Sequence, residues 1–445
     1  MNLITNIMNN NIFLKKIANR VLASYKHYKD IEVSIIKTIG ISISTRYGEV
    51  ENIEFNNNEV LEVTVFFEHK RGTASSNNFN DHSLLNIIDK AKSIARYSSP
   101  DLCAGIADKE LLAFNPVDLD LYHPMNLDVK FIINLAGQAE KTALKYDPRI
   151  IGTEGGKFTS YATTKVFGNS HGMLSSYSVS QHMLSCSVIA ESDGVMEQNY
   201  AYTLDRSFDN LQSPEWVGQE CAKRAVSHLG SKKIKTIKSK VIFVSEIATS
   251  LFKHLASAIQ GDNVWRKSTF LLNKLGQIIF PNWISIKELP HIFKGIGSAP
   301  FDNEGVQTID RTIIRNGILE SWLLDTYSAR KIKSKSTGNS GGIYNWDITY
   351  KNINFVELIK NMHRGLIVTN LMGQGVNILT GDYSRGVSGF WVDSGEIKYP
   401  VNEITISGNL EKMFLNIVAI SNDIETRDSI RCGSVLIDDM QIAGI

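Results

Sequence analysis

The chain has 445 residues, of which 43% are apolar and 21% are charged, a composition typical of a globular protein and a length that predicts two domains. Its 47 basic and 46 acidic residues give a formal net charge of +1, which provides no field to attract nucleic acid or an anionic membrane. No apolar run approaches the roughly 20 residues that cross a bilayer, and the N-terminus lacks the pattern of a secretory signal. The four cysteines are scattered without a CxxC pair. These features predict a cytoplasmic protein with reduced thiols and with neither nucleic acid nor membrane as a partner.

The first half of the chain predicts helices packed on an antiparallel sheet. Apolar residues recur at helical spacing in three segments, Phe13–Tyr28, Asp81–Tyr97 and Val129–Tyr146. The apolar stripe of the second segment consists of Leu84, Ile87, Ile88, Ala91 and Ala95. Alternating, β-branched residues predict strands over Ile31–Thr45 and Val60–Glu68. The region Ile150–Tyr202, rich in Ser, Thr, Gly and aromatic residues, predicts further strands and turns.

A change of pattern near the middle of the chain predicts the domain boundary. A helix is predicted over Pro214–Leu229, and five lysines then interrupt the pattern in Ser231–Lys240 before the apolar run Val241–Val244. Acidic residues elsewhere balance these lysines, so we interpret the segment as a solvated connector. Beyond residue 296, strand-like runs alternate with Gly-rich turns. The predicted fold class is therefore α+β: an N-terminal domain of helices on an antiparallel sheet over residues 1–235, followed by a β-rich, barrel-like C-terminal domain over residues 236–445.

Several short blocks, most of them containing glycine, are the most specific feature of the last third of the chain. They are Gly297–Gly305, Asp325–Arg330, Ser336–Gly342, Gly373–Gly386, Ser388–Trp391 and Arg431–Leu436. A single glycine cluster says little, but this series in this order resembles the PmbA branch of the TldD/PmbA metalloprotease family. The resemblance extends more loosely upstream, to Gly155–Tyr161 and to the helix predicted at Ser245–Asp262, and so covers most of the chain.

The resemblance implies a zinc protease whose catalytic TldD subunit carries an HExxxH motif on the helix after the first strand of the C-terminal domain. The two histidines of such a motif hold zinc, and its glutamate is the general base for the bound water. Anchored on the Gly261–Asp262 end of the matching helix, this chain has Phe252, Lys253 and Ser257 at the three positions. Phe has no lone pair, protonated Lys repels a cation, and Ser is a poor zinc ligand beside imidazole. We therefore expect no metal site and no catalytic residue in this chain.

His254 lies on the same predicted helix but two positions out of register with the motif. No pair among the ten histidines has His-x₃₋₅-His spacing. Because a zinc site needs three or four converging ligands, we interpret His254 as a surface or core residue.

Two other catalytic interpretations involve Ser340 and Cys432. Gly338–Gly342 matches GxSxG, a motif that presents a nucleophilic serine between a strand and a helix. Polar residues precede it where a buried strand is required, so we interpret it as a flexible glycine loop. Cys432 follows Arg431, which would favour a thiolate, whereas the apolar run that begins at Val435 favours a small buried cysteine. No Walker loop or GxGxxG motif supports a nucleotide cofactor.

By resemblance, the chain is the PmbA/TldE-type, non-catalytic subunit of a cytoplasmic, hetero-oligomeric metalloprotease that cuts extended, poorly folded peptides. Zinc is then expected in a TldD-type partner, and no cofactor is expected in this chain. Candidate contacts to the peptide or partner, chosen because they fall in the family blocks, are Ser340, Gly341, Asp382, Ser384 and Arg385. The alternatives are a stand-alone peptide-binding protein and a hydrolase in its own right that uses Ser340 or Cys432. A paralogue with an intact HExxxH motif in the same genome would favour the subunit over the binding protein.

Overall fold

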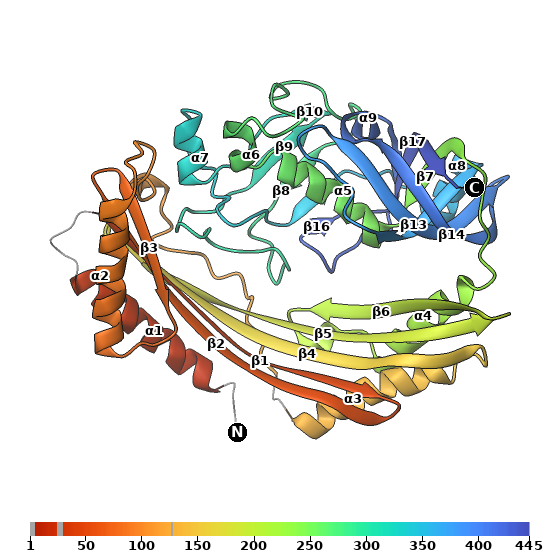
Figure 1. Cartoon of the computed structure of the whole chain (residues 1–445), viewed down its shortest axis with the longest axis horizontal. Helices are drawn as coiled ribbons and strands as arrows, with labels where there is room; N and C mark the ends of the chain where they lie inside the picture. Colours follow the sequence, from red (N-terminus) through yellow and green to blue (C-terminus); the bar gives the residue numbers. More distant parts are fainter. Residues whose placement is uncertain (1–4, 25–29, 126–127, 445) are drawn as a thin grey trace.

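The first half of the chain is built on one long antiparallel sheet, as seen in a computed structural model that describes residues 5–24, 30–125 and 128–444 (Figure 1). The sheet has six strands in the order β3-β2-β1-β4-β5-β6. Their bounds are β1 Asp30–Arg46, β2 Glu49–Phe67, β3 Lys70–Ser76, β4 Ile150–Asn169, β5 Leu174–Ser192 and β6 Val195–Asp205. The strands predicted in this half are confirmed. β2, however, begins at Glu49 and not at Val60, because pairing with β1 extends it through exposed residues that carry no apolar alternation.

Four helices cover one face of this sheet. They are α1 Thr5–Ser24, α2 Asp81–Tyr97, α3 Val129–Leu144 and α4 Pro214–Ser227. The odd-numbered residues of β1 face them: Ile35 packs with α1 and α2, whereas Ile43 packs with α3 and α4. The even-numbered residues, such as Ser34 and Thr38, therefore lie on the opposite face. Cross-strand pairs keep this separation, for example Ile43 with Phe158 and Thr38 with Thr163.

The four helices predicted in the N-terminal half are confirmed, with different ends for three of them, whereas the helix predicted at Ser245–Asp262 is divided: one helix ends at Ala258 and another begins at Gly261. α2 has the predicted bounds and the predicted buried stripe, because the Asn80 side chain caps its start by accepting a hydrogen bond from the Ser83 amide and Pro100 follows its end. α3 and α4 end two residues before their predicted ends, at Leu144 and Ser227. α1 starts earlier than predicted, and residues 25–28 of that prediction lie outside the described residues. Two short 3-10 helices occur at Lys109–Leu111 and Phe208–Asn210.

The C-terminal half contains a closed five-stranded barrel, which confirms the predicted fold class. The strands run β14-β13-β12-β7-β17, and pairing of β14 with β17 closes the ring, while β15 extends it from β17. Their bounds are β7 Ile237–Phe243, β12 Gly365–Met372, β13 Asp382–Asp393, β14 Glu396–Asn409, β15 Ile417–Ile420 and β17 Val435–Ala443. A second sheet, in the order β10-β9-β8-β11-β16, joins the largest apolar core of the molecule.

The remaining elements of this half are short. The strands are β8 Ile286–Glu288, β9 Arg311–Arg315, β10 Ile318–Leu319, β11 Trp346–Ile348 and β16 Ile430–Arg431. The helices are α5 Ser245–Ala258, α6 Gly261–Trp265, α7 Thr326–Lys331, α8 Phe355–Met362 and α9 Leu410–Leu415. Within the described ranges, no helix is long and apolar enough to cross a membrane.

The C-terminal half lies along the sheet on the side away from α3 (Figure 1). A small core fastens the two halves: Phe167, on the polar face of β4, packs with Phe301 and Val306. Arg206 adds a polar contact by donating hydrogen bonds to the carbonyl oxygens of Ile296 at 2.5 Å and Gly295 at 3.4 Å. The polar face of the sheet is thus the face that meets the C-terminal half.

We expect Gly156→Ala to destabilise the fold by about 1–3 kcal/mol, the usual cost of overpacking. A Cβ on Gly156 would lie 2.0 Å from the Ala136 carbonyl oxygen, so α3 would have to move off β4. Gly137→Ala is the matched control, since a Cβ there meets nothing within 4 Å and alanine favours the helix. Urea unfolding of both variants measures the difference, and equal stability would contradict the close approach of α3 to β4.

Candidate functional site

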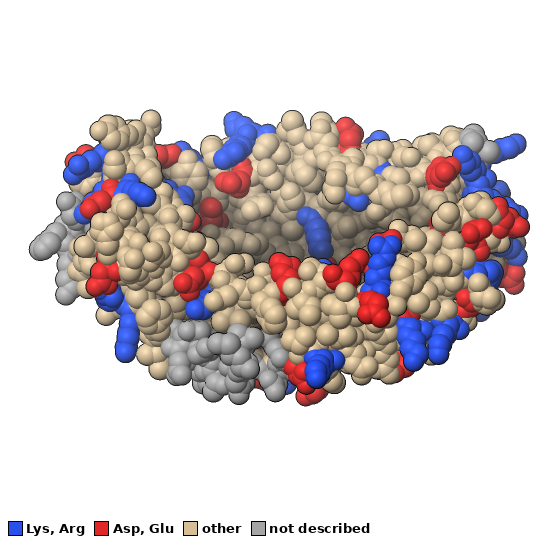
Figure 2. Space-filling view, turned by 60° about the horizontal axis from the view of Figure 1, so that its bottom comes forward, with Lys and Arg blue, Asp and Glu red and all other residues tan. Residues whose placement is uncertain are grey.

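A hollow runs along the molecule, with acidic side chains on its lower rim and a basic side chain inside it (Figure 2). One cavity of about 540 Å³ lies between the polar face of the sheet and the C-terminal half. Strands β1 and β2 supply one wall, and the loops around residues 303, 325 and 340 supply the other. The charged residues that line it are Glu32, Glu62, Asp101, Asp262, Glu304 and Asp325, together with Arg71 and Arg266.

Carboxyl groups in and beside this cavity have raised pKa values. Burial raises the pKa of Glu32 to about 8, and the neighbouring Glu304 carboxylate adds to the effect. Burial also raises the pKa of Asp302 to about 8, although Asp302 accepts hydrogen bonds from the amides of Ser340 and Val306. Within the described part of the chain, the Glu32 side chain has no hydrogen bond or ion pair. Such carboxyls exchange protons near neutral pH and favour a cationic or hydrogen-bond-donating neighbour.

A group of charged residues is joined by hydrogen bonds beside this cavity. Arg330, on α7, donates to the carbonyl oxygens of Gly105 at 3.2 Å and Ile106 at 2.8 Å. Asp101 accepts hydrogen bonds of 2.8 Å each from Tyr327 and Lys331. The Lys331 ammonium, through its hydrogen bond, is the main reason that the pKa of Asp101 falls to about 2. The segment 101–106 is therefore held against α7.

One of the five predicted contact residues, Ser340, lines this cavity, and a second, Gly341, follows it in the chain. The Ser340 backbone carbonyl accepts a hydrogen bond of 2.9 Å from the Asn303 amide. Gly341 has a φ of +103°, and a Cβ there would lie 2.2 Å from the Asn303 side chain. The positive φ favours glycine at this position.

The other three predicted residues lie at the start of β13 and do not line this cavity. The Asp382 carboxylate accepts a hydrogen bond from the Thr380 hydroxyl at 2.7 Å. The Ser384 amide donates to the Gly375 carbonyl oxygen at 2.6 Å, and Arg385 donates to the Met372 carbonyl oxygen at 3.2 Å. These bonds shape the loop that leads into β13. The five residues thus form two groups.

Sequence reasoning missed Glu32, Arg71 and Glu304, which lie around the cavity. Glu32 is one polar residue in the alternation of β1, and its strand position shows only which face it occupies. Glu304 falls within the predicted block Gly297–Gly305, so that block carried a usable signal. Nothing in the sequence pairs it with Glu32, because the two are far apart along the chain.

Helix α5 carries the positions where the family motif would stand, and none of them is suited to zinc. Phe252 is fully buried and stacks on Phe280 with ring centroids 6.2 Å apart. The Lys253 ammonium lies 2.5 Å from an Asp428 carboxylate oxygen. Among the described residues, no three His, Cys, Asp or Glu side chains gather in a way that could hold a metal ion. The residues present on α5 therefore do not fit a zinc site.

His254 is a half-buried residue of the same helix. Its ring centroid lies 6.1 Å from that of Tyr383, and its Nε2 atom makes no hydrogen bond with the described residues. Burial, and secondly the charge of Arg385, lower its pKa to about 4, so the imidazole is neutral at pH 7. Among the described residues, His254 belongs to no group of three or more potential metal ligands.

Neither proposed nucleophile has an activating partner among the described residues. Cys432 is fully buried, and burial raises its pKa well above the usual value for a thiol. The Arg431 guanidinium is 4.0 Å from the Asp347 carboxylate and so has an anionic neighbour of its own. Ser340 sits in a glycine loop, and its hydroxyl makes no hydrogen bond to a histidine. The geometry of a serine or cysteine hydrolase, in which a base lies within hydrogen-bond reach, is absent from the described residues.

Three family models match the chain and define its class as metallopeptidase. They are described as PmbA/TldA metallopeptidase domain 1 over residues 31–95, the central domain over residues 122–229 and the C-terminal domain over residues 236–444. The chain belongs to the PmbA/TldD metallopeptidase family, as a PmbA-type member. The predicted resemblance is confirmed.

Relatives of known name and structure span the full length of the chain. The chain is 55% identical to metalloprotease PmbA of Escherichia coli O157:H7 over 93% of this chain and 92% of that protein. It is 47% identical to a metalloprotease PmbA homolog of Buchnera aphidicola subsp. Acyrthosiphon pisum over the whole of both chains, a coverage of 100% each. A Bacteroides thetaiotaomicron protein described as a modulator of DNA gyrase has a TM-score of 0.91, at 25% identity over 97% of this chain and 99% of that one. TldE of Thermococcus kodakarensis, at 19% identity over 96% of this chain and 99% of that one, shares the fold with a TM-score of 0.81.

We expect only Cys103 to react rapidly with a thiol reagent in the native protein, because it is half-buried while Cys186, Cys221 and Cys432 are buried. Reagent titration should find one fast thiol in the native state and four after denaturation. Cys103→Ser is the control and should remove the fast reaction. Fast labelling of Cys432, identified by peptide mass analysis, would contradict its burial and would again make Cys432 a candidate nucleophile.

Proposed function

We propose that this chain is the non-catalytic, TldE-type subunit of a cytoplasmic metallopeptidase that acts on extended, poorly folded peptides. In this proposal a TldD-type partner carries the zinc ion and cuts the peptide. The observation that carries the proposal is the sequence of helix α5, in which Phe252, Lys253 and Ser257 occupy the positions of the zinc ligands and the base in the HExxxH motif. Family membership supports a hydrolase, and these residues favour the catalytic step taking place in another subunit.

The packing of α5 explains why small changes would not restore a metal site. Phe252 fills core space between α5 and Phe280, so an imidazole there would lose apolar contacts and bring a polar ring into the core. Lys253 is held by Asp428, and its ammonium has no free electron pair to act as a base. A working site needs every ligand, the base and the groups that orient them.

The hollow supports a role in peptide binding. Strands line the cavity at Ser340 on one side and loop backbone with glycines lines it on the other, which suits contacts to the main chain of a peptide. Under the proposal, Ser340 and Gly341 contact the peptide at this cavity. Asp382, Ser384 and Arg385 form a separate contact region for the peptide or the partner at the start of β13.

A stand-alone peptide-binding protein is the alternative function, favoured by the same cavity. It differs from the subunit proposal in one measurable respect: adding a TldD-type protein would then leave peptide turnover and complex formation unchanged. The experiment below separates the two.

We expect the purified chain to hold no stoichiometric zinc and to cleave no peptide, and both properties to arise on mixing with a TldD-type protein. The reason is the loss of both imidazoles and the carboxylate base on α5. Elemental analysis measures the metal, and a peptide assay with and without chelator measures cleavage. About one zinc per isolated chain together with chelator-sensitive cleavage would overturn the proposal and direct attention to His254.

We expect Ser340→Ala and Cys432→Ser, made separately, to leave cleavage by the assembled complex within a few-fold of the wild type. Loss of a true serine-protease nucleophile lowers kcat by roughly 10⁶-fold. Steady-state rates on one peptide, with assembly checked by gel filtration, provide the measurement. A collapse of the rate in either variant with assembly intact would show that this chain has its own active site.

A further inference from the structure

One stretch of β5 is a free strand edge. β6 pairs with β5 only from His182 onward, so the part of β5 before it has no strand neighbour on that side. The Ser180 amide donates to the Leu121 carbonyl oxygen at 2.9 Å, which shows that Ser180 directs its backbone groups away from β4. Alternate residues of a strand share this direction. Ser176 and Ser178 therefore direct their amide and carbonyl groups outward, where no described residue pairs with them.

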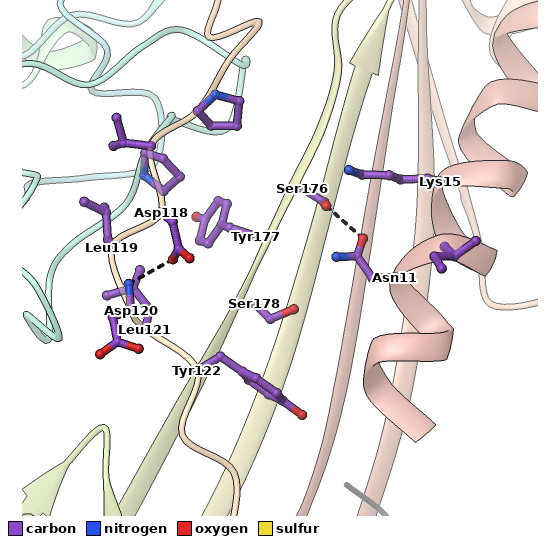
Figure 3. Close-up of a pocket in the computed structure, with 14 residues that line it drawn as sticks. Asn11, Lys15, Asp118, Leu119, Asp120, Leu121, Tyr122, Ser176, Tyr177 and Ser178 are labelled. Carbon is purple, nitrogen blue, oxygen red and sulfur yellow. Dashed lines mark hydrogen bonds between the residues drawn. The ribbon is translucent and has the colours of Figure 1, made fainter. Parts of the chain in front are cut away.

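The chain segment 113–121 contacts this edge at its two ends, and its middle part lies away from the edge. Its first contact is the Ser175 hydroxyl, which donates to the Ala113 carbonyl oxygen at 3.3 Å, and its last is the bond at Ser180. The middle part is bonded to the C-terminal half, because the Lys294 amide donates a hydrogen bond to the Leu119 carbonyl oxygen at 3.0 Å. The space between segment 113–121, β5 and α1 is a cavity of about 760 Å³ (Figure 3).

The charged side chains around this cavity differ in their hydrogen-bond and ion-pair partners. The Asp118 carboxylate accepts a hydrogen bond from the Asp120 amide at 3.0 Å. Asp120 in turn lies 3.5 Å from the Lys294 ammonium. Lys15, by contrast, extends from α1 toward β5 beside Ser176 and has no ion pair with any described residue (Figure 3). Among the described residues, the cavity thus presents a lysine without an ion pair next to an unpaired strand edge, and the Asp118 carboxylate across the cavity also has no ion pair.

We propose that this cavity binds the C-terminal end of an extended peptide. The peptide main chain pairs with the backbone groups of Ser176 and Ser178, and its terminal carboxylate pairs with the Lys15 ammonium. Strand addition and carboxylate capture are established ways to bind a peptide with little dependence on its sequence. The inference rests on the proposed function for the peptide nature of the ligand, and it assigns a site separate from the cavity at Ser340.

The length of the free edge supports recognition of a chain end. The unpaired stretch runs from Ser176 to Val179, between the contacts at Ser175 and Ser180. At about 3.3 Å per residue, it can pair with roughly three residues of a peptide. A stretch this short suits a terminus, whose carboxylate adds a charge-assisted bond that an internal segment lacks.

The test compares one labelled, unstructured peptide as its free acid and as its C-terminal amide, by fluorescence anisotropy on the full-length chain. Amidation should weaken binding by about tenfold or more, a typical effect of losing a charge-assisted hydrogen bond. Lys15→Gln should remove this difference between acid and amide. Lys16→Gln is the matched control, because Lys16 is the next residue of α1, is exposed and does not line the cavity. A peptide N-methylated near its C-terminus should also bind more weakly, since it loses a backbone donor.

Equal binding of acid and amide by the wild type, an unchanged preference in Lys15→Gln, or no binding at about 1 mM peptide would each overturn the inference. Thermal unfolding of both lysine variants shows whether the fold is retained. The proposed function fails by a different result, namely zinc and cleavage in the isolated chain. Normal cleavage by the assembled complex with no preference for the free acid would sink this inference alone.

Discussion

The alternation of side chains along the long strands is the constraint on which the rest of the structure depends. Because neighbours on a strand point to opposite faces, β1 presents Ile35 and Ile43 to the helices and Ser34 and Thr38 to the C-terminal half. A shift of one residue would exchange the two faces. The same register that buries the apolar cores therefore builds a largely polar wall, which lines the cavity at Ser340 and meets the C-terminal half in a small apolar core only at Phe167.

Backbone pairing and apolar packing hold the region around α5 together. The barrel closes through backbone pairing of β14 with β17, and α5 is held by apolar residues such as Leu251, Phe252 and Leu255, which are all fully buried. Phe252 replaces a polar ligand by an aromatic ring that adds to the core. The residues at the motif positions of α5 are thus part of the apolar packing and surface ion pairing of this half.

Local patterns predicted much of the fold, whereas the sites depend on contacts that the sequence does not contain. The ends and buried stripe of α2 follow from Asn80, the apolar spacing and Pro100. The glycine blocks indicated the family and led to Ser340, yet they also led to Asp382, which lies elsewhere. Glu32 reaches its cavity only because β1 passes opposite the C-terminal loops. The free edge of β5 depends on where β6 begins to pair, and no residue pattern marks that point.

The two cavities are linked by one of the family blocks. Pro300 lines the cavity beside β5, and Asn303 and Glu304 line the cavity at Ser340. Asp302 lies between them and is fixed by hydrogen bonds from the amides of Glu304, Val306 and Ser340, all within 3.0 Å. Tyr177 strengthens the link, because its ring packs edge-on against Phe301 with centroids 5.0 Å apart. A peptide end seated at Ser176 would therefore lie against a rigid segment that also shapes the second cavity, which gives the block a physical reason for its composition beyond its glycines.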